Sequence, residues 1–122
     1  MGRYAVFICS LLVAAATAAL PAQDADTALT GRWRGRAVVE NAEMGLDVEI
    51  KAAGGKAEGT VTTAHGALTI TGGTFAQGKW TLPFSGPGVE GRMVGIVKGD
   101  RFTGDWLNPA LGPGFFELAR VK

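Results

Sequence analysis

Few side chains in this sequence are suited to catalysis. Beyond residue 22 the chain has one serine, Ser85, and one histidine, His65, with neither tyrosine nor cysteine. Ser85 lies among prolines and glycines and His65 precedes a turn glycine, so their spacing does not suggest a Ser–His–acid triad. One histidine with scattered carboxylates also falls short of a zinc site's three or four ligands. We therefore predict that the protein is not an enzyme, that it has no cofactor or metal, and that His65 is an exposed turn residue.

The three tryptophans are more informative. Trp33, Trp80 and Trp106 fall in apolar alternations that would turn them toward the interior, and Phe102 does the same. Two interpretations stay open: these rings pack as a plain core, or they line a cavity for a small apolar ligand. On the second interpretation the ligand-binding residues are these four and Leu111, which would contact the ligand as a lid. Small residues expected at other inward positions favour some remaining space; they are Ala37, Ala57, Gly59, Gly91, Gly95 and Gly104.

Short alternating segments separated by glycine turns must position these residues. The chain has 19 glycines, which disfavour helices but suit the turns of an antiparallel meander. No stretch shows the spacing of an amphipathic helix. We therefore predict an all-β fold, an up-and-down meander of about eight short strands closed into a small barrel. The expected strand segments, eight or nine in all, are 30–40, 44–52, 56–63, 67–71, 74–76, 79–84, 89–98, 101–107 and 115–121, with wider rim loops at 85–88 and 108–114.

Three arginines alternate with the inward residues of the first strand. With Trp33 pointing inward, Arg32, Arg34 and Arg36 point outward, where Asp47 and Glu49 of the next strand can balance them. In the opposite register they would line the interior and bind an anion. Burying three unpaired guanidiniums is costly, so we favour a solvated outer face.

The N-terminal segment resembles a secretory signal peptide. Arg3 supplies a positive charge, the following stretch to Leu20 is almost wholly apolar, and small residues crowd the end of that stretch. Cleavage after Ala22 is favoured over cleavage after Ala19, and an uncleaved membrane anchor is the alternative. We expect a signal peptide at 1–22, a flexible lead-in at 23–29, and a barrel domain at 30–122 in a protein exported to the periplasm or secreted.

Charge excludes one class of partner. Loss of Arg3 with the signal would leave 11 basic and 11 acidic residues, whereas a nucleic-acid-binding protein usually carries a basic excess. We therefore expect no nucleic-acid partner. Since no later stretch is long and apolar enough for a spanning helix, we also expect that the mature form is not embedded in a membrane.

Two ends of the chain carry a pattern that would close a barrel. Gly31, Arg32 and Trp33 open the first strand, and Arg120 lies in the last, where its guanidinium could lie across the indole. We assign Gly31, Trp33 and Arg120 to barrel closure. This pattern resembles the calycin superfamily, the lipocalin- and avidin-type barrels, over essentially all of 30–122. The chain is shorter than a typical lipocalin and lacks its C-terminal helix and second signature. It is also similar to small exported bacterial β-barrel proteins of uncharacterised function.

These observations leave two functions in view. The first is an exported, non-enzymatic barrel that binds a small apolar ligand in an aromatic-lined interior. The alternative is a solid structural module that binds a protein partner through its rim or outer face.

Overall fold

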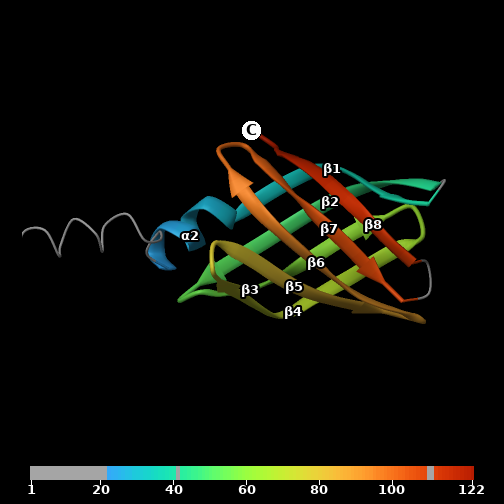
Figure 1. Cartoon of the computed structure of the whole chain (residues 1–122), viewed down its shortest axis with the longest axis horizontal. Coiled ribbons are helices and arrows are strands. Elements are labelled where there is room, and N and C mark those ends of the chain that lie inside the picture. The colour runs from blue at the N-terminus through green and yellow to red at the C-terminus, as the bar shows by residue number, and fades with distance from the viewer. Residues whose placement is uncertain (1–21, 41, 110–111) are drawn as a thin grey trace, which may run out of the picture.

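Eight antiparallel strands close into a barrel in the computed structural model, which describes residues 22–40, 42–109 and 112–122 (Figure 1). Each strand pairs with its neighbours in chain order, and β1 pairs with β8 to complete the ring. The predicted all-β meander closed into a barrel is confirmed. The elements are α2 (Ala22–Leu29), β1 (Gly31–Val39), β2 (Ala42–Ala53), β3 (Lys56–Thr63), β4 (Gly66–Ala76), β5 (Lys79–Gly86), β6 (Val89–Lys98), β7 (Arg101–Asn108) and β8 (Gly112–Arg120).

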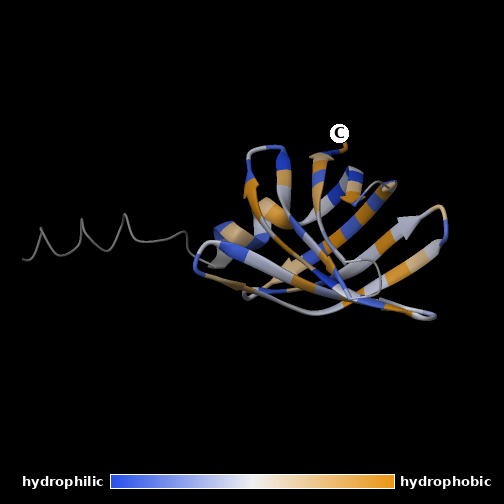
Figure 2. Cartoon of the chain, turned by 45° about the vertical axis from the view of Figure 1, so that its right-hand side comes forward, coloured by the Kyte–Doolittle hydropathy of each residue, from blue (hydrophilic) through white to orange (hydrophobic). Residues whose placement is uncertain are grey.

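Alternation along the strands decides which side chains fill the barrel. In Figure 2 hydrophobic and hydrophilic residues follow one another along the strands. In β2, for example, Leu46, Val48 and Ile50 are buried, while the residues between them face outward. A shift of one residue would turn this whole apolar set to solvent, so the pattern fixes the pairing register.

The segment 66–76 forms one irregular strand, not the two short strands that we expected. The pairing of β4 with β5 shifts between Ile70 and Thr74, and Gly72 within this interval has a φ of 72°. Pro83 of β5 lies opposite the interval, where strand pairing is interrupted and its missing N–H is tolerated. The glycines expected to form a turn therefore form a bulge instead.

Both rim connections are shorter than predicted, since β7 continues to Asn108 and β8 begins at Gly112, within the loop expected at 108–114. The expected loop at 85–88 is shorter, because β5 continues to Gly86 and β6 begins at Val89, with only Pro87 and Gly88 between them. The loop after β7 lies at the same end of the barrel. Its residues 110–111 are outside the described part of the chain.

A helix closes the opposite end of the barrel (Figure 1). We expected a flexible lead-in at 23–29, and this prediction was wrong, since α2 occupies Ala22–Leu29 with Ala25 and Leu29 buried. The Asp26 side chain accepts a hydrogen bond from the Gly55 amide at 3.0 Å, which joins the helix to the β2–β3 turn. Within the described ranges, no helix has the length and apolar character to cross a membrane. Residues 1–21 of the expected signal peptide lie outside the described residues.

Aromatic rings fill the half of the barrel next to α2. Phe102 contacts Trp33 with ring centroids 5.8 Å apart and Phe116 at 4.9 Å. The inward glycines leave no empty space there, contrary to our expectation. A Cβ at Gly95 would lie 2.7 Å from the Phe116 ring, and one at Gly104 would lie 2.0 Å from a backbone oxygen of β6. These glycines let rings and strands approach one another, so this half is a packed core.

Candidate functional site: a cavity at the end opposite the helix

The two ends of the barrel differ in the described part of the chain, where α2 covers one end and a cavity lies at the other. At the α2 end, Trp33 lies fully buried and donates its indole N–H to the Leu29 carbonyl at 2.9 Å. The Arg120 guanidinium lies 4.3 Å from the centroid of the Trp33 ring. It also donates to the backbone carbonyls of Thr30, at 2.9 Å, and Ala28. The predicted closure by Trp33 and Arg120 is present, and it also holds the C-terminal end of α2.

The predicted ligand-binding residues do not gather around one space. Trp33, Trp80 and Phe102 are buried in the half of the barrel next to α2. Trp106 lies near the other end of the barrel, two residues before the end of β7. Leu111 lies outside the described residues. Of the four aromatic residues, Trp106 alone lines a cavity described below.

That cavity lies at the end of the barrel opposite α2 and has a volume of about 380 Å³. Its walls come from the beginnings of β2, β4 and β6, the ends of β3 and β7, and the turns between them. The lining is mostly apolar, and the residues that form it are Met44, Thr63, His65, Gly66, Ala67, Leu68, Pro87, Val89, Trp106 and Asn108.

Trp106 is the largest side chain of the cavity wall. It is 1% exposed, and its ring stacks on Phe84 with centroids 4.6 Å apart and planes inclined by 29°. Its indole Nε1 is buried and has no hydrogen-bond partner among the described residues. This differs from Trp33, whose equivalent nitrogen is satisfied by Leu29. Trp106 therefore contributes a buried, stacked ring to the cavity wall.

Polar groups stand at the mouth and inside the wall. His65 is exposed, as predicted, and its backbone amide donates to the Thr63 hydroxyl at 3.0 Å in the β3–β4 turn. The same hydroxyl donates to the Gly66 carbonyl at 3.0 Å, which fixes the turn. Asn108 is the one polar residue buried in the described part of the chain, at 5% exposure. The site thus combines apolar walls with a few polar groups, the composition typical of small-molecule sites.

Sequence reasoning missed most of this wall. Met44, Thr63, Leu68 and Val89 occupy strand ends, where alternation shows an inward direction but not how far the core packing extends. His65 was interpreted only as a turn residue, although it also lines the mouth. The sequence signal that could have found them is their position: in an up-and-down barrel, these strand ends all meet at the same end of the barrel.

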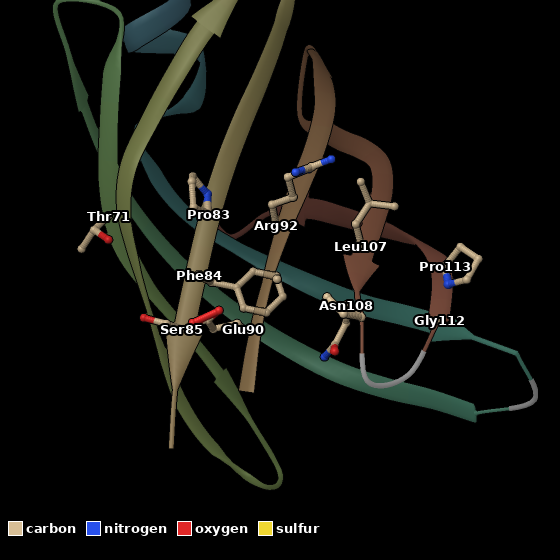
Figure 3. A pocket seen from close by; sticks show the side chains of 12 residues that line it. Thr71, Pro83, Phe84, Ser85, Glu90, Arg92, Leu107, Asn108, Gly112 and Pro113 are labelled. Atoms are coloured by element: carbon tan, nitrogen blue, oxygen red, sulfur yellow. The ribbon is translucent and has the colours of Figure 1, made fainter. Parts of the chain in front are cut away.

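A second, more open hollow crosses the outer face of β5 to β8 (Figure 3). Pro83, Arg92, Leu107 and Pro113 form a row across these strands, since each pairs with the next. The hollow measures about 740 Å³. Ser85 lies here, on the exposed face, whereas His65 lines the cavity, so the two side chains open onto different spaces.

The arginines of β1 lie on the outer face, as predicted. Arg32 and Arg34 reach Asp47 at 3.6 and 3.4 Å. Arg36 pairs instead with Glu117 at 2.8 Å and Glu43 at 3.0 Å. A hydrogen bond to Glu117 and the charge of Glu43 raise the pKa of Arg36 above its ordinary value. These cations are therefore partnered on the surface and supply no interior anion site.

Metal-ligating side chains are dispersed over the described ranges, where no three His, Cys, Asp or Glu residues lie together in a group suited to a metal ion. No protein-family model matches the chain, and a search of curated proteins finds no significant match. The closed eight-stranded barrel is compatible with a calycin-like fold.

Proposed function

We propose that the protein is an exported, non-enzymatic binding protein that takes a small apolar ligand into the cavity opposite α2. The observation that carries this proposal is an apolar cavity of about 380 Å³ whose wall includes the buried Trp106. Eight-stranded barrels have interiors that side chains just fill or that hold one small ligand. Here the half next to α2 is filled, and the space lies at the other end.

The cavity volume restricts the ligand to a compact molecule. Ligand pockets commonly measure about 300–1,000 Å³, and this one is near the lower limit. The walls from Met44, Leu68 and Val89 offer dispersion contacts and would remove apolar ligand surface from water. The exposed His65 side chain stands where a ligand would enter.

Uptake of the uncharged fluorescent probe N-phenyl-1-naphthylamine tests this proposal. The purified protein should enhance the probe's fluorescence and transfer energy to it from tryptophan. Val89→Phe should abolish uptake, because the larger side chain fills the cavity. The matched control is Val94→Phe in the same strand, at a position that faces outward and should leave uptake unchanged. Equal uptake by both variants would contradict binding in this cavity.

Export is the second part of the proposal. It is supported by Arg3, the apolar segment after it and the small residues that follow, the arrangement typical of a secretory signal peptide. Cleavage after Ala22 would leave residues 23–29 of the helix that closes the barrel on the mature chain. The intact mass of the protein from its exported fraction checks the cleavage position, and an unprocessed mass would contradict it.

The outer face supports an alternative function, binding of a protein partner. Phe115 is 44% exposed on the outer wall, in the row next to the one that runs from Pro83 to Pro113, and Ile96 is 40% exposed further along β6. On this alternative, Phe115→Ser would abolish capture of a partner from the exported fraction, while probe uptake would be absent from the unmodified protein as well.

A further inference from the structure

The outer wall formed by β5 to β8 carries an exposed aromatic ring beside an open hollow. Phe115 of β8 is 44% exposed. Pro113 lies two residues before it on the same face of β8, and Leu107 lies opposite Pro113. Both residues line the hollow of about 740 Å³ (Figure 3). Apolar surface therefore continues from the ring into the hollow, and continuous apolar surface of this kind marks an interaction site.

Two charges of opposite sign lie within this apolar surface. Arg92 of β6 and Asp105 of β7 are exposed, and neither has an ion pair or hydrogen bond in the described part of the chain. The outward arginines of β1, by contrast, each reach a carboxylate. Arg92 is opposite Leu107, and Asp105 is opposite Val94. The two charges therefore occupy diagonal corners of a rectangle, with an apolar side chain at each of the other two corners.

This arrangement is complementary to itself. In a symmetric dimer of two facing copies, a residue i that meets residue j is matched by a residue j that meets residue i. A two-fold axis along the diagonal from Val94 to Leu107 brings Arg92 of each copy opposite Asp105 of the other. With strands about 4.8 Å apart and a rise of about 3.4 Å per residue, the same rotation places Phe115 of each copy over the hollow of the other.

We propose that the protein forms a symmetric homodimer through this outer face, with Phe115 of each copy seated in the facing hollow and Arg92 paired with Asp105 across the axis. We assign the partner to a second copy of the chain because one face supplies both members of each complementary pair, an acid with a base and a ring with a hollow. The proposal goes beyond ligand binding, since the cavity is a separate space with its own wall.

Sedimentation velocity over a range of concentrations of the purified protein tests the dimer. The protein should sediment as a dimer at high concentration and dissociate on dilution. No larger species should form, because a two-fold contact closes on itself. A single monomeric species up to millimolar concentration would overturn the proposal, and so would assembly beyond the dimer.

Charge reversal tests the contact itself. Arg92→Asp places acids opposite each other on both sides of the axis, and Asp105→Arg does the same with bases, so each variant alone should be monomeric. An equal mixture of the two should form a heterodimer, because every acid then faces a base. The control is Lys51→Asp, the same change of charge on an exposed residue of β2, which should leave dimer formation unchanged. A mixture that stays monomeric would overturn the assigned contact.

Phe115→Ala tests the ring without changing the charge, and it decides the question if either charge variant does not fold. Loss of this anchor should weaken the dimer about tenfold or more. An unchanged dissociation constant would overturn the seating of Phe115 in the hollow. Probe uptake by each variant should equal that of the unmodified protein, so failure of the dimer is distinguished from failure of cavity binding.

Discussion

Arg120 lies across the indole face of Trp33, 4.3 Å from the ring centroid, and joins the last strand to the first. The same guanidinium donates to two carbonyls at the end of α2 and pairs with Asp100 at 3.4 Å. One side chain therefore connects three parts of the chain, namely the helix, β1 and the β6–β7 turn. This end of the barrel is closed by directional contacts as well as by apolar packing.

Arg120→Ala should lower the free energy of unfolding by about 2–3 kcal/mol, because it leaves helix carbonyls unpaired and removes a cation–π contact. Arg120→Lys keeps the charge but not the planar fork, so it should restore only part of this loss. Urea denaturation followed by tryptophan fluorescence measures both. The control is Arg34→Ala. The Arg34 side chain is 63% exposed, so its removal should change the free energy of unfolding little. Equal effects at the two positions would contradict the closing role of Arg120.

Leu29→Ala tests whether α2 is part of the folded barrel. Leu29 is fully buried against the barrel end, so truncation should destabilise the protein by about 3 kcal/mol. Leu107→Ala is the matched control, since that leucine is half-buried on the outer wall and should cost less. If thermal unfolding showed no larger loss of stability for Leu29→Ala than for Leu107→Ala, the packing of α2 on the barrel end would not contribute to stability.

Gly104→Ala tests the close approach of β6 and β7. The added Cβ would lie 2.0 Å from the Val94 carbonyl oxygen, so the strands would have to separate, at a cost of about 3 kcal/mol. Gly45 provides the contrasting position, because a Cβ there meets nothing within 4 Å. Gly45→Ala should stabilise the protein by about 0.5 kcal/mol through a less flexible unfolded chain. Similar effects in chemical denaturation would show that the strand spacing is not limiting.

Asp100 should make a small contribution to stability that depends on pH. Its hydrogen bond and ion pair with Lys122, at 2.9 Å, hold the pKa of this carboxyl below its ordinary value, with a lesser effect from Arg120. A lowered folded-state pKa stabilises the fold above the unfolded-state pKa of about 3.9, and this contribution is lost as pH falls through the folded value.

Comparison of the unmodified protein with Asp100→Asn at neutral pH and at pH about 2 measures this contribution. The difference in unfolding free energy should be present at neutral pH and absent at the acidic value. A difference that persists in acid would mean that Asp100 acts through its shape and not its charge. Lys122→Met, which removes the first partner, should reduce the same difference.

The barrel could be predicted from sequence because alternation and turn chemistry agree along nearly the whole chain. Trp33, Leu82 and Trp106 occupy inward positions in such alternations, and each is buried. The contact of Trp33 with Arg120 could also be predicted from the sequence, because a closed meander must place its first and last strands side by side.

Helix α2 and the cavity could not be predicted from the sequence in this way. The helix is eight residues long, and among its residues 24–29, whose side chains the structure describes, Ala25 and Leu29 are buried, too few apolar positions to produce a recognisable period. The cavity depends on how far aromatic rings reach along the barrel axis. Phe116 of β8 occupies the space beside Gly95, so the volume that the missing side chain of this glycine was expected to leave empty is filled by a ring from another strand.

Methyl-resolved nuclear magnetic resonance during titration with camphor tests the central claim most directly, because it locates the bound molecule without altering the protein. Methyl signals of Met44, Leu68 and Val89 in the cavity wall should shift together and saturate. Those of Val94 and Leu107, which face outward, should stay in place. Shifts confined to the outer-face methyl groups, or none at any concentration, would contradict a ligand-binding cavity at the end of the barrel opposite α2.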